Sequence, residues 1–164
     1  MTAVLPHYKQ GAASYQVSTL MFGGQLAEPT TQTAGTTDLT VKPAVAASTH
    51  VLGVVGKDGN VLTAQTGAAN TYGAPLIDMS VLDDFVSVYY GGVDIWAWYS
   101  AAVTPGGKLL AAANGTVGPA GADPAADQVV GVCTHPGGVS AAMLTQALGG
   151  LGATSFFLGR VRIF

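Results

Sequence analysis

The sequence predicts a mainly β fold, a compact β-barrel or β-sandwich of short strands and hairpins with one short helix over about residues 140–148. Three observations predict it. Runs rich in valine, threonine and aromatic residues are separated by turn dipeptides. Glycine is abundant, at 23 of 164 residues, and it supplies the positive φ that tight turns need. Helical periodicity, in contrast, is scarce.

Three dipeptides each predict a β-hairpin, because Asp-Gly, Gly-Gly and Asn-Gly suit the primed turns that join adjacent strands. They lie between residues 51–55 and 61–63, between 86–90 and 93–99, and between 108–113 and 116–117. The last predicted strand is Arg160–Phe164. Its two arginines share one face, while Val161 and Ile163 share the other, as a half-buried strand requires.

One segment favours a helix instead. Ser140 is a good N-cap for the run 141–148, whose apolar side chains fall on one side, and Gly149 is a suitable stop. The segments 28–40 and 118–127 are rich in threonine, alanine, glycine and proline and are expected to be connections.

A repeat divides the chain. Gly23–Ala27 is echoed by Gly106–Leu110, and Thr49–Val55 is echoed by Asp127–Cys133. We therefore predict a flexible N-terminal arm, 1–10, and a single β-rich domain, 11–164. The domain would hold two related cassettes, about 15–66 and 86–135, followed by a C-terminal helix and strand. Chance similarity in a chain rich in glycine, alanine and valine is the alternative.

The chain carries few charges. Charged residues make up 9% of it, against about a quarter in a typical soluble domain. So thinly charged a surface is expected to associate with other proteins, because net charge and interspersed ions keep lone domains apart. With six basic residues and a net charge of −3, no basic stripe exists to follow a phosphate backbone, so we expect no nucleic-acid partner.

We also expect no membrane partner. The most apolar long stretch, 85–103, is interrupted by Gly91-Gly92, carries Asp94 at its centre and consists of strand formers. Residues 1–11 lack a basic leader and an apolar h-region, so folding in a reducing cytoplasm is expected. Cys133 is the one cysteine, which excludes an intrachain disulfide framework and suggests a small buried apolar residue.

Motifs of catalysis are missing from the sequence. The three histidines, His7, His50 and His135, do not have the spacing of metal ligands on one element. No G-x-S-x-G turn or phosphate-binding loop occurs, and the acidic pair Asp83-Asp84 is typical of a solvated turn. We therefore expect no enzyme activity, no small-molecule substrate, no metal and no cofactor.

Aromatic residues gather in one region. Tyr89, Tyr90, Trp96, Trp98 and Tyr99 are predicted to be core or interface side chains, since aromatics at alternate strand positions usually pack. On this pattern Trp96 and Trp98 share a strand face with Asp94. The alternative is a carbohydrate platform formed by Trp96, Trp98 and Tyr99.

The segment from Val86 to His135 carries a family resemblance. It reads strand, turn, strand, then 104–110 (TPGGKLL), Asn114–Val117 and Val129–Val132, and the chain closes on Gly159–Ile163. This order resembles the capsid decoration, or head-cement, proteins of tailed bacteriophages, which share an A-G-D/G-x-L-y … G-x-V … I-I-G-V-A run and a terminal V-R-V-x-L strand. The segment 140–158 departs from the family pattern as an insertion, and the N-terminal half is longer.

The resemblance implies a structural virion protein that binds the capsid exterior, is assembled in the bacterial host cytoplasm, and cements neighbouring capsomers around packed DNA. Implied partners are the major capsid protein and two further copies of the chain in a homotrimer. The arm would order on the shell through Thr2, Val4, Leu5, Pro6 and Tyr8. Alternatives are another virion component, such as a tail or head-fibre part, and a β-sandwich surface- or carbohydrate-binding module.

Overall fold

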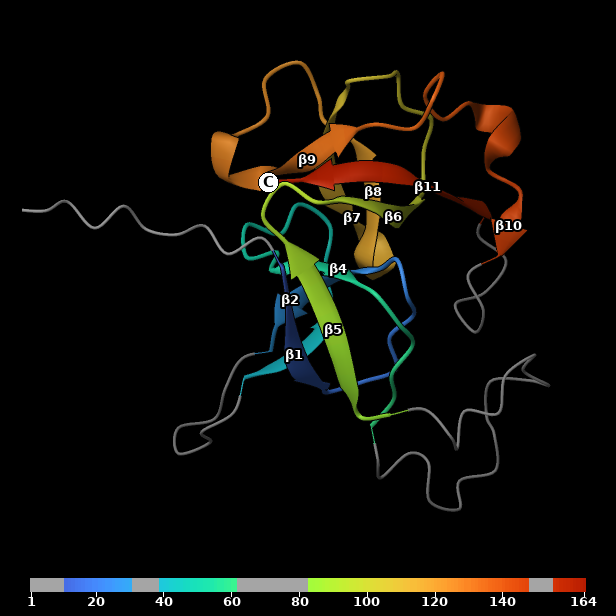
Figure 1. Ribbon diagram of the computed structural model, residues 1–164. Helices are drawn as coiled ribbons and strands as arrows, with labels where there is room; N and C mark the ends of the chain where they lie inside the picture. The colour runs from blue at the N-terminus through green and yellow to red at the C-terminus, as the bar shows by residue number, and fades with distance from the viewer. Residues whose placement is uncertain (1–10, 31–38, 62–82, 148–154) are drawn as a thin grey trace, which may run out of the picture.

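The computed structural model describes residues 11–30, 39–61, 83–147 and 155–164. Its strands form two sheets, and each sheet closes on itself into a small barrel. The two barrels lie one above the other in Figure 1, with the N-terminal barrel below and the C-terminal barrel above. The prediction of a mainly β fold is confirmed.

The N-terminal barrel has five strands in the order β1-β3-β2-β4-β5. Only β1 and β3 are parallel, and β5 pairs with β1 along most of its length to close the ring. The strands are β1 (Gly11–Val17), β2 (Leu26–Pro29), β3 (Thr40–Pro43), β4 (Gly53–Val55) and β5 (Phe85–Tyr90).

The C-terminal barrel closes through β6-β8-β7-β9-β11, and a short strand, β10, adds to the outer side of β11. Here β6 and β8 are the parallel pair. The strands are β6 (Asp94–Tyr99), β7 (Lys108–Ala112), β8 (Thr116–Pro119), β9 (Val129–Cys133), β10 (Gln146–Ala147) and β11 (Ser155–Ile163).

The two barrels have the same topology. In each, the first strand is parallel to the third, and every other neighbouring pair is antiparallel. Connections within a sheet rarely reproduce one order of five strands by chance. The second barrel therefore repeats the first, with β6, β7, β8, β9 and β11 in the places of β1 to β5.

Equivalent backbone hydrogen bonds show which residues of the two barrels correspond. Ser18 donates its amide to Val41 O, and Ser100 donates to Val117 O; both hydroxyls also reach the same carbonyl. Gly24 N donates to Val55 O, as Gly106 N does to Cys133 O. Both glycines have positive φ, 91° and 72°.

The sequence similarity extends further than the two segments recognised from the sequence. Thr40–Ala44 (TVKPA) corresponds to Thr116–Ala120 (TVGPA), on β3 and β8. The glycine pairs, however, correspond with a shift of one residue, because Gly24 rather than Gly23 matches Gly106 in hydrogen bonding. The repeated units span Gly11–Tyr90 and Asp94–Ile163.

The barrels share apolar contacts. One buried cluster fills the N-terminal barrel, with Val17, Val41 and Val86 among its members. A larger cluster fills the C-terminal barrel and also takes in Leu26, Ala44 and Val54 of the N-terminal barrel. Cys133 is a member of the larger cluster and is 2% exposed, as expected of a small buried apolar residue.

Of the three predicted hairpins, the one at Asn114-Gly115 is confirmed: β7 and β8 pair across it, and both turn residues have positive φ. The hairpin across Gly91-Gly92 is wrong. β5 and β6 belong to different barrels, and the two glycines, with φ of 76° and 78°, form the connection between them.

For the hairpin predicted at Asp58-Gly59, residues 62–63 of the second strand lie outside the described residues, and the turn itself bonds elsewhere. β4 pairs with β2 and β5, while Gly59 exchanges backbone hydrogen bonds with Met21. Asp58 accepts a hydrogen bond from Gly23 N at 2.7 Å. The loop is held by distant partners, so residues 51–61 do not fold back on themselves.

The helix expected over about 140–148 shrinks to a single 3-10 turn, Ala141–Met143, and Gln146–Ala147 then form β10. The Ser140 side chain makes no capping hydrogen bond. The backbone of Gln146 and Ala147 instead pairs with the edge of β11. This pairing satisfies backbone groups that a helix would satisfy by its internal hydrogen bonds. The terminal strand is as predicted, with Arg160 and Arg162 exposed and Val161 and Ile163 buried.

Candidate functional site

The face of β6 carries the aromatic residues that the sequence singles out. Asp94 and Trp96 are exposed and Trp98 is half-buried, while Ala97 and Tyr99 point inward. The predicted shared face of Asp94, Trp96 and Trp98 is therefore present. Strand alternation places Tyr99 on the opposite side.

Tyr99 is a core residue. Its ring is fully buried and its hydroxyl donates to Arg160 O at 2.8 Å. Burial raises the pKa of the Tyr99 phenol well above its usual range, so the group stays neutral. It has no exposed ring face to offer a sugar, and the platform of Trp96, Trp98 and Tyr99 is not formed.

Trp98 joins the two barrels. Its indole Nε1 donates to Gly23 O at 2.8 Å, and its backbone amide donates to Gly24 O at 3.0 Å. A Cβ atom on Gly24 would lie 2.9 Å from Trp98 Cδ1, so the close approach requires glycine there. The structure thus places Trp98 at an interface, between two halves of one chain.

Trp96 is 51% exposed and stands beside a shallow pocket of about 480 Å³ at the seam between the barrels. The lining is apolar or glycine: Gly23, Gly24, Val55, Gly56, Ile95, Trp96 and Leu158. One edge of the indole contacts His135, with ring centroids 6.4 Å apart, and His135 in turn contacts Phe157. The pocket could hold an apolar group but offers no acid–base pair.

Tyr89 and Tyr90 are half-buried at the end of β5. The ring of Tyr89 lies where a side chain on Gly56 would be, with its Cε2 atom against the position of an ideal Cβ. Tyr90 pairs with Gly11 at the start of β1. Both tyrosines belong to the N-terminal barrel, at the end of β5 that leads to the connection with β6.

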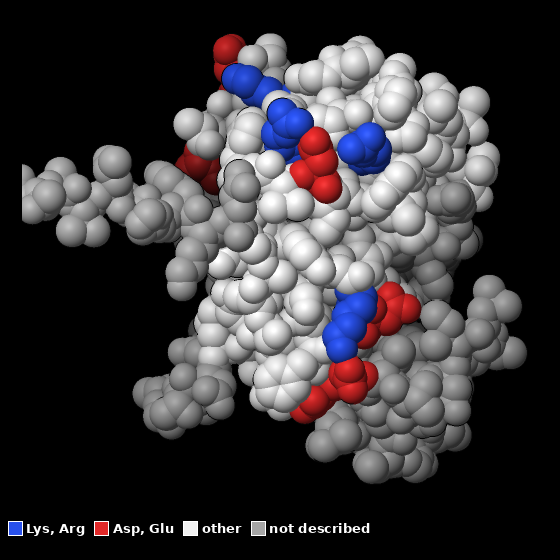
Figure 2. Space-filling view, viewed as in Figure 1, with Lys and Arg blue, Asp and Glu red and all other residues white. Residues whose placement is uncertain are grey.

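Beside Trp96, Asp94 and Arg162 form a two-pronged ion pair across β6 and β11, with Nε–Oδ1 at 3.1 Å and Nη2–Oδ2 at 2.8 Å. The guanidinium holds the pKa of Asp94 below its usual value. Figure 2 shows charged side chains in small groups, over the upper and the lower barrel, separated by a broad uncharged surface.

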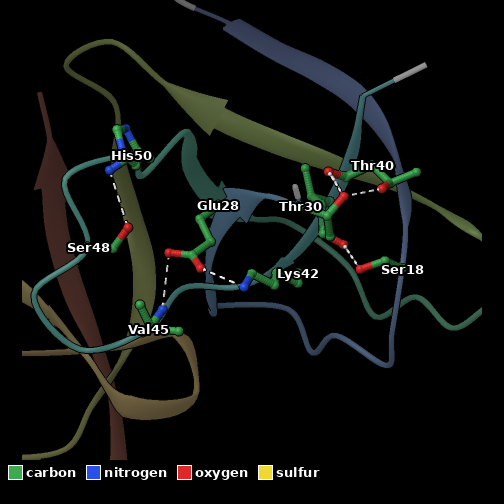
Figure 3. A network of polar contacts seen from close by, with 9 residues as sticks. Ser18, Glu28, Thr30, Thr40, Lys42, Val45, Ser48 and His50 are labelled. Atoms are coloured by element: carbon green, nitrogen blue, oxygen red, sulfur yellow. Dashed lines mark hydrogen bonds and ion pairs between the residues drawn. The ribbon is translucent and has the colours of Figure 1, made fainter. Parts of the chain in front are cut away.

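The sequence gives no sign that the carboxylate of Glu28 is buried. Glu28 is 6% exposed, accepts a hydrogen bond from Val45 N at 3.2 Å and pairs with Lys42 at 3.2 Å (Figure 3). Burial by itself would raise its pKa, but hydrogen bonds from Ser48, Val45 and Lys42 outweigh burial and lower the pKa. No sequence signal marks it, because its partners come from the next strand and the loop that follows.

Glu28 and its partners Lys42, Val45 and Ser48 stabilise a loop that contacts the other barrel. In that loop Ala47 N donates to Ala111 O, and Ala44 O accepts from Gly115 N, both at 2.8 Å. Glu28 therefore has a structural role, holding the loop 44–48 in place against the C-terminal barrel.

The remaining sequence candidates do not assemble into a site. Lys57 pairs with Asp83, and Asp84 accepts from Gln16, so the acidic pair is held by separate partners. Among the described residues, no three histidine, cysteine or acidic side chains are grouped to hold a metal ion. Over the same residues, no helix is long and apolar enough to cross a membrane. The arm residues Thr2, Val4, Leu5, Pro6 and Tyr8, and His7, lie outside the described residues.

Comparison with known proteins gives a likeness among solved structures. No family model and no curated protein matches the sequence. Among solved structures, the fold is similar to the crystal structure of the head fiber gp8.5 N base in bacteriophage phi29, with a TM-score of 0.56 and 13% sequence identity. The match covers 93% of this chain and 92% of that one, so it extends over both barrels.

Proposed function

We propose that this chain is a structural protein of a tailed-phage virion, which binds the exterior of the capsid and cements neighbouring capsomers. The observation that supports the proposal is the likeness of its fold, over both barrels, to the N base of a phage head fibre. Within the virion, a head-fibre component is the nearest alternative to a cement protein.

The surface chemistry supports a role in an assembly. The chain has nine acidic and six basic residues, and uncharged surface separates the charged groups of the face shown in Figure 2. Several large apolar side chains are exposed: Leu39, Val45, Phe85, Trp96, Met143 and Phe164. Many identical copies on a shell would let modest apolar contacts of this kind act together.

The proposed partners are the major capsid protein and further copies of the chain in a homotrimer. We propose that the arm, through Thr2, Val4, Leu5, Pro6 and Tyr8, orders on the capsid by adding a strand to a capsid loop. A chain without residues 1–10 keeps every described strand, since these lie between Gly11 and Ile163.

Co-sedimentation with capsids of the parent phage tests the function. A cement protein should saturate at a fixed ratio to the major capsid protein and raise the temperature at which capsids rupture. A head-fibre component should saturate at fewer sites and leave that temperature unchanged. A chain that stays in the supernatant at every ratio would contradict both roles.

Deleting residues 1–10 tests the arm separately. Capsid binding should fall while circular dichroism and the unfolding temperature of the free chain stay unchanged. If the truncated chain binds capsids as the full chain does, the arm is not the attachment element.

A second candidate function is binding of a surface carbohydrate, favoured by one observation: the half-exposed ring of Trp96 beside the seam pocket. Aromatic faces stack on sugars, but here neither Trp98 nor Tyr99 is free to add a second ring. Glycans should then change tryptophan fluorescence in the wild type but not in Trp96→Ala. Trp96→Phe is the matched control, since it keeps an aromatic ring.

A further inference from the structure

The contact between the two barrels joins two different surfaces. The N-terminal barrel contributes what we term the glycine face: Gly24, Leu26, Ala44 and Val54. The C-terminal barrel contributes the tryptophan face: Trp98, Leu158 and Gly115. A contact between unlike surfaces is heterologous. Because the barrels repeat, one surface of each kind is left unused: a glycine face on the C-terminal barrel and the counterpart of the tryptophan face on the N-terminal barrel.

The faces meet at close range. A Cβ on Gly24 would lie 3.0 Å from Leu158 Cδ1, and one on Gly115 would lie 2.7 Å from Leu26 O. The backbone of Trp98 bonds to Gly24, and that of Gly115 bonds to Ala44. This interface is therefore specific in its geometry, because these bonds and the one from Ala47 N to Ala111 O surround an apolar contact.

The C-terminal barrel carries a second glycine face. By strand pairing, Gly24, Leu26, Ala44 and Val54 correspond to Gly106, Lys108, Ala120 and Val132. Gly106 and Lys108 are exposed, and Ala120 and Val132 are half-exposed. A Cβ on Gly106 would meet nothing within 4 Å, whereas Gly24 is hemmed in by Trp98.

The N-terminal barrel carries the counterpart of the tryptophan face. Trp98 pairs with Leu158 on β11, and Gln16, its counterpart, pairs with Phe85 on β5. Phe85 is 51% exposed, although the corresponding Leu158 is half-buried against the other barrel. The counterpart of the Asn114-Gly115 turn lies outside the described residues.

We propose that a second copy of this chain docks head to tail, placing Gly106 of its C-terminal barrel against Gln16 and Phe85 of the first copy. The contact repeats the one that already joins the barrels within the chain. Lys108 stands where the joined face has Leu26, and the Asp84 carboxylate accepts a hydrogen bond from Gln16 on the other free face, so the two free faces carry opposite charges. This inference concerns the chain in solution and is independent of any capsid.

Sedimentation equilibrium of the purified chain tests the association. The wild type should self-associate with rising concentration, and Phe85→Ala should raise the dissociation constant by at least about tenfold, as loss of a buried aromatic anchor does. Phe164→Ala is the matched control, because Phe164 is 64% exposed and lies on neither face. A wild type that stays monomeric, or equal losses in both variants, would overturn the proposal.

A second variant blocks the other face. In the Gly106→Asn variant, asparagine tolerates the positive φ of 72°. A Cβ atom at this position would meet nothing within 4 Å in the free chain. The variant should fold with an unchanged unfolding temperature in dilute solution yet lose association. Undiminished association of this variant would contradict the proposed contact.

The direction of docking is tested by cysteine cross-linking. The backbones of Trp98 and Gly24 approach within hydrogen-bonding distance, so their counterparts Gln16 and Gly106 should come within disulfide range between copies. A mixture of Gln16→Cys and Gly106→Cys chains should form covalent dimers on mild oxidation, and neither variant should do so alone. A Gln16→Cys dimer formed without its partner would indicate a symmetric contact and overturn head-to-tail docking.

Discussion

At the scale of single residues, glycines decide how closely the two barrels approach. Gly115 has a φ of 68° and sits in the Asn114-Gly115 turn, against the backbone of β2. A methyl group there would collide with Leu26 O at 2.7 Å and press on Gln25 and Pro43. Gly115 is therefore required both by the turn and by the interface.

We expect Gly115→Ala to destabilise the chain by about 2–4 kcal/mol, since it adds overpacking to an unfavourable φ. Chemical denaturation followed by tryptophan fluorescence measures the loss. Gly118→Ala is the matched control, because its Cβ would meet Ala112 at an ordinary 3.6 Å, and it should cost less than about 1 kcal/mol. Equal losses at both positions would contradict the packing argument.

Glu28 gives the stability of the chain a dependence on acid. Its pKa in the folded chain lies below the ordinary 4.5, so its hydrogen bonds stabilise the fold above that pH. The contribution is lost as pH falls through the lowered pKa. We expect Glu28→Gln to cost about 1–3 kcal/mol at neutral pH.

The gap between wild type and Glu28→Gln should stay constant above about pH 6 and narrow below pH 4.5. Urea unfolding at a series of pH values measures this gap. A gap that widens on acidification would mean that the carboxylate is not stabilised by its partners.

At the scale of elements, β11 holds the C-terminal barrel together, because it pairs with β6, β9 and β10. Its last three residues make the contact with β9 that closes the ring. Cys133, on β9, is buried behind this contact.

Truncation of the chain after Gly159 should open the C-terminal barrel and expose the Cys133 thiol. Reaction with a thiol reagent under native conditions should then become rapid, whereas it is slow in the wild type. Removing Phe164 alone is the control: it takes away one backbone hydrogen bond, to Val130 O, but leaves the three paired residues of β11, so Cys133 should stay protected. A protected thiol in the longer truncation would show that β9 does not need β11.

The elements also show what could be predicted from the sequence. The Asn114-Gly115 hairpin was predictable because its turn and both strands are adjacent along the chain. The connections at Asp58-Gly59 and Gly91-Gly92 have the same local signals, but their residues bond to distant partners, Gly59 to Met21 and Gly92 to Ile163. Loop residues that favour a turn do not specify which strands flank it in space.

The candidate site was predictable in the same limited way. Strand alternation placed Asp94, Trp96 and Trp98 on one face, and Tyr99 was predicted as one of several core or interface aromatics. That Trp98 would bond to Gly23 depends on how one barrel docks on another, which no local pattern encodes. The repeat was visible in two segments, and the third, on β3 and β8, emerged only once strand pairing had aligned the barrels.

At the scale of the whole molecule, the barrels are expected to unfold together. Leu26, Ala44 and Val54 of the N-terminal barrel belong to the buried cluster of the C-terminal barrel, so opening either exposes apolar surface of both. We expect a single transition in which tryptophan fluorescence, which reports on β6, and far-UV circular dichroism coincide. Two separated transitions would mean that the shared cluster contributes little.

The ends of each repeat are neighbours. β1 and β5 pair from Gly11 to Tyr90, so the first residue of the unit lies beside the last, and a short connection from Tyr90 suffices to begin the next unit. Such a module can be appended, excised or circularly permuted without threading the chain through itself. Gene duplication and fusion can therefore lengthen this kind of protein by one repeat unit at a time, while each unit keeps its own closed barrel.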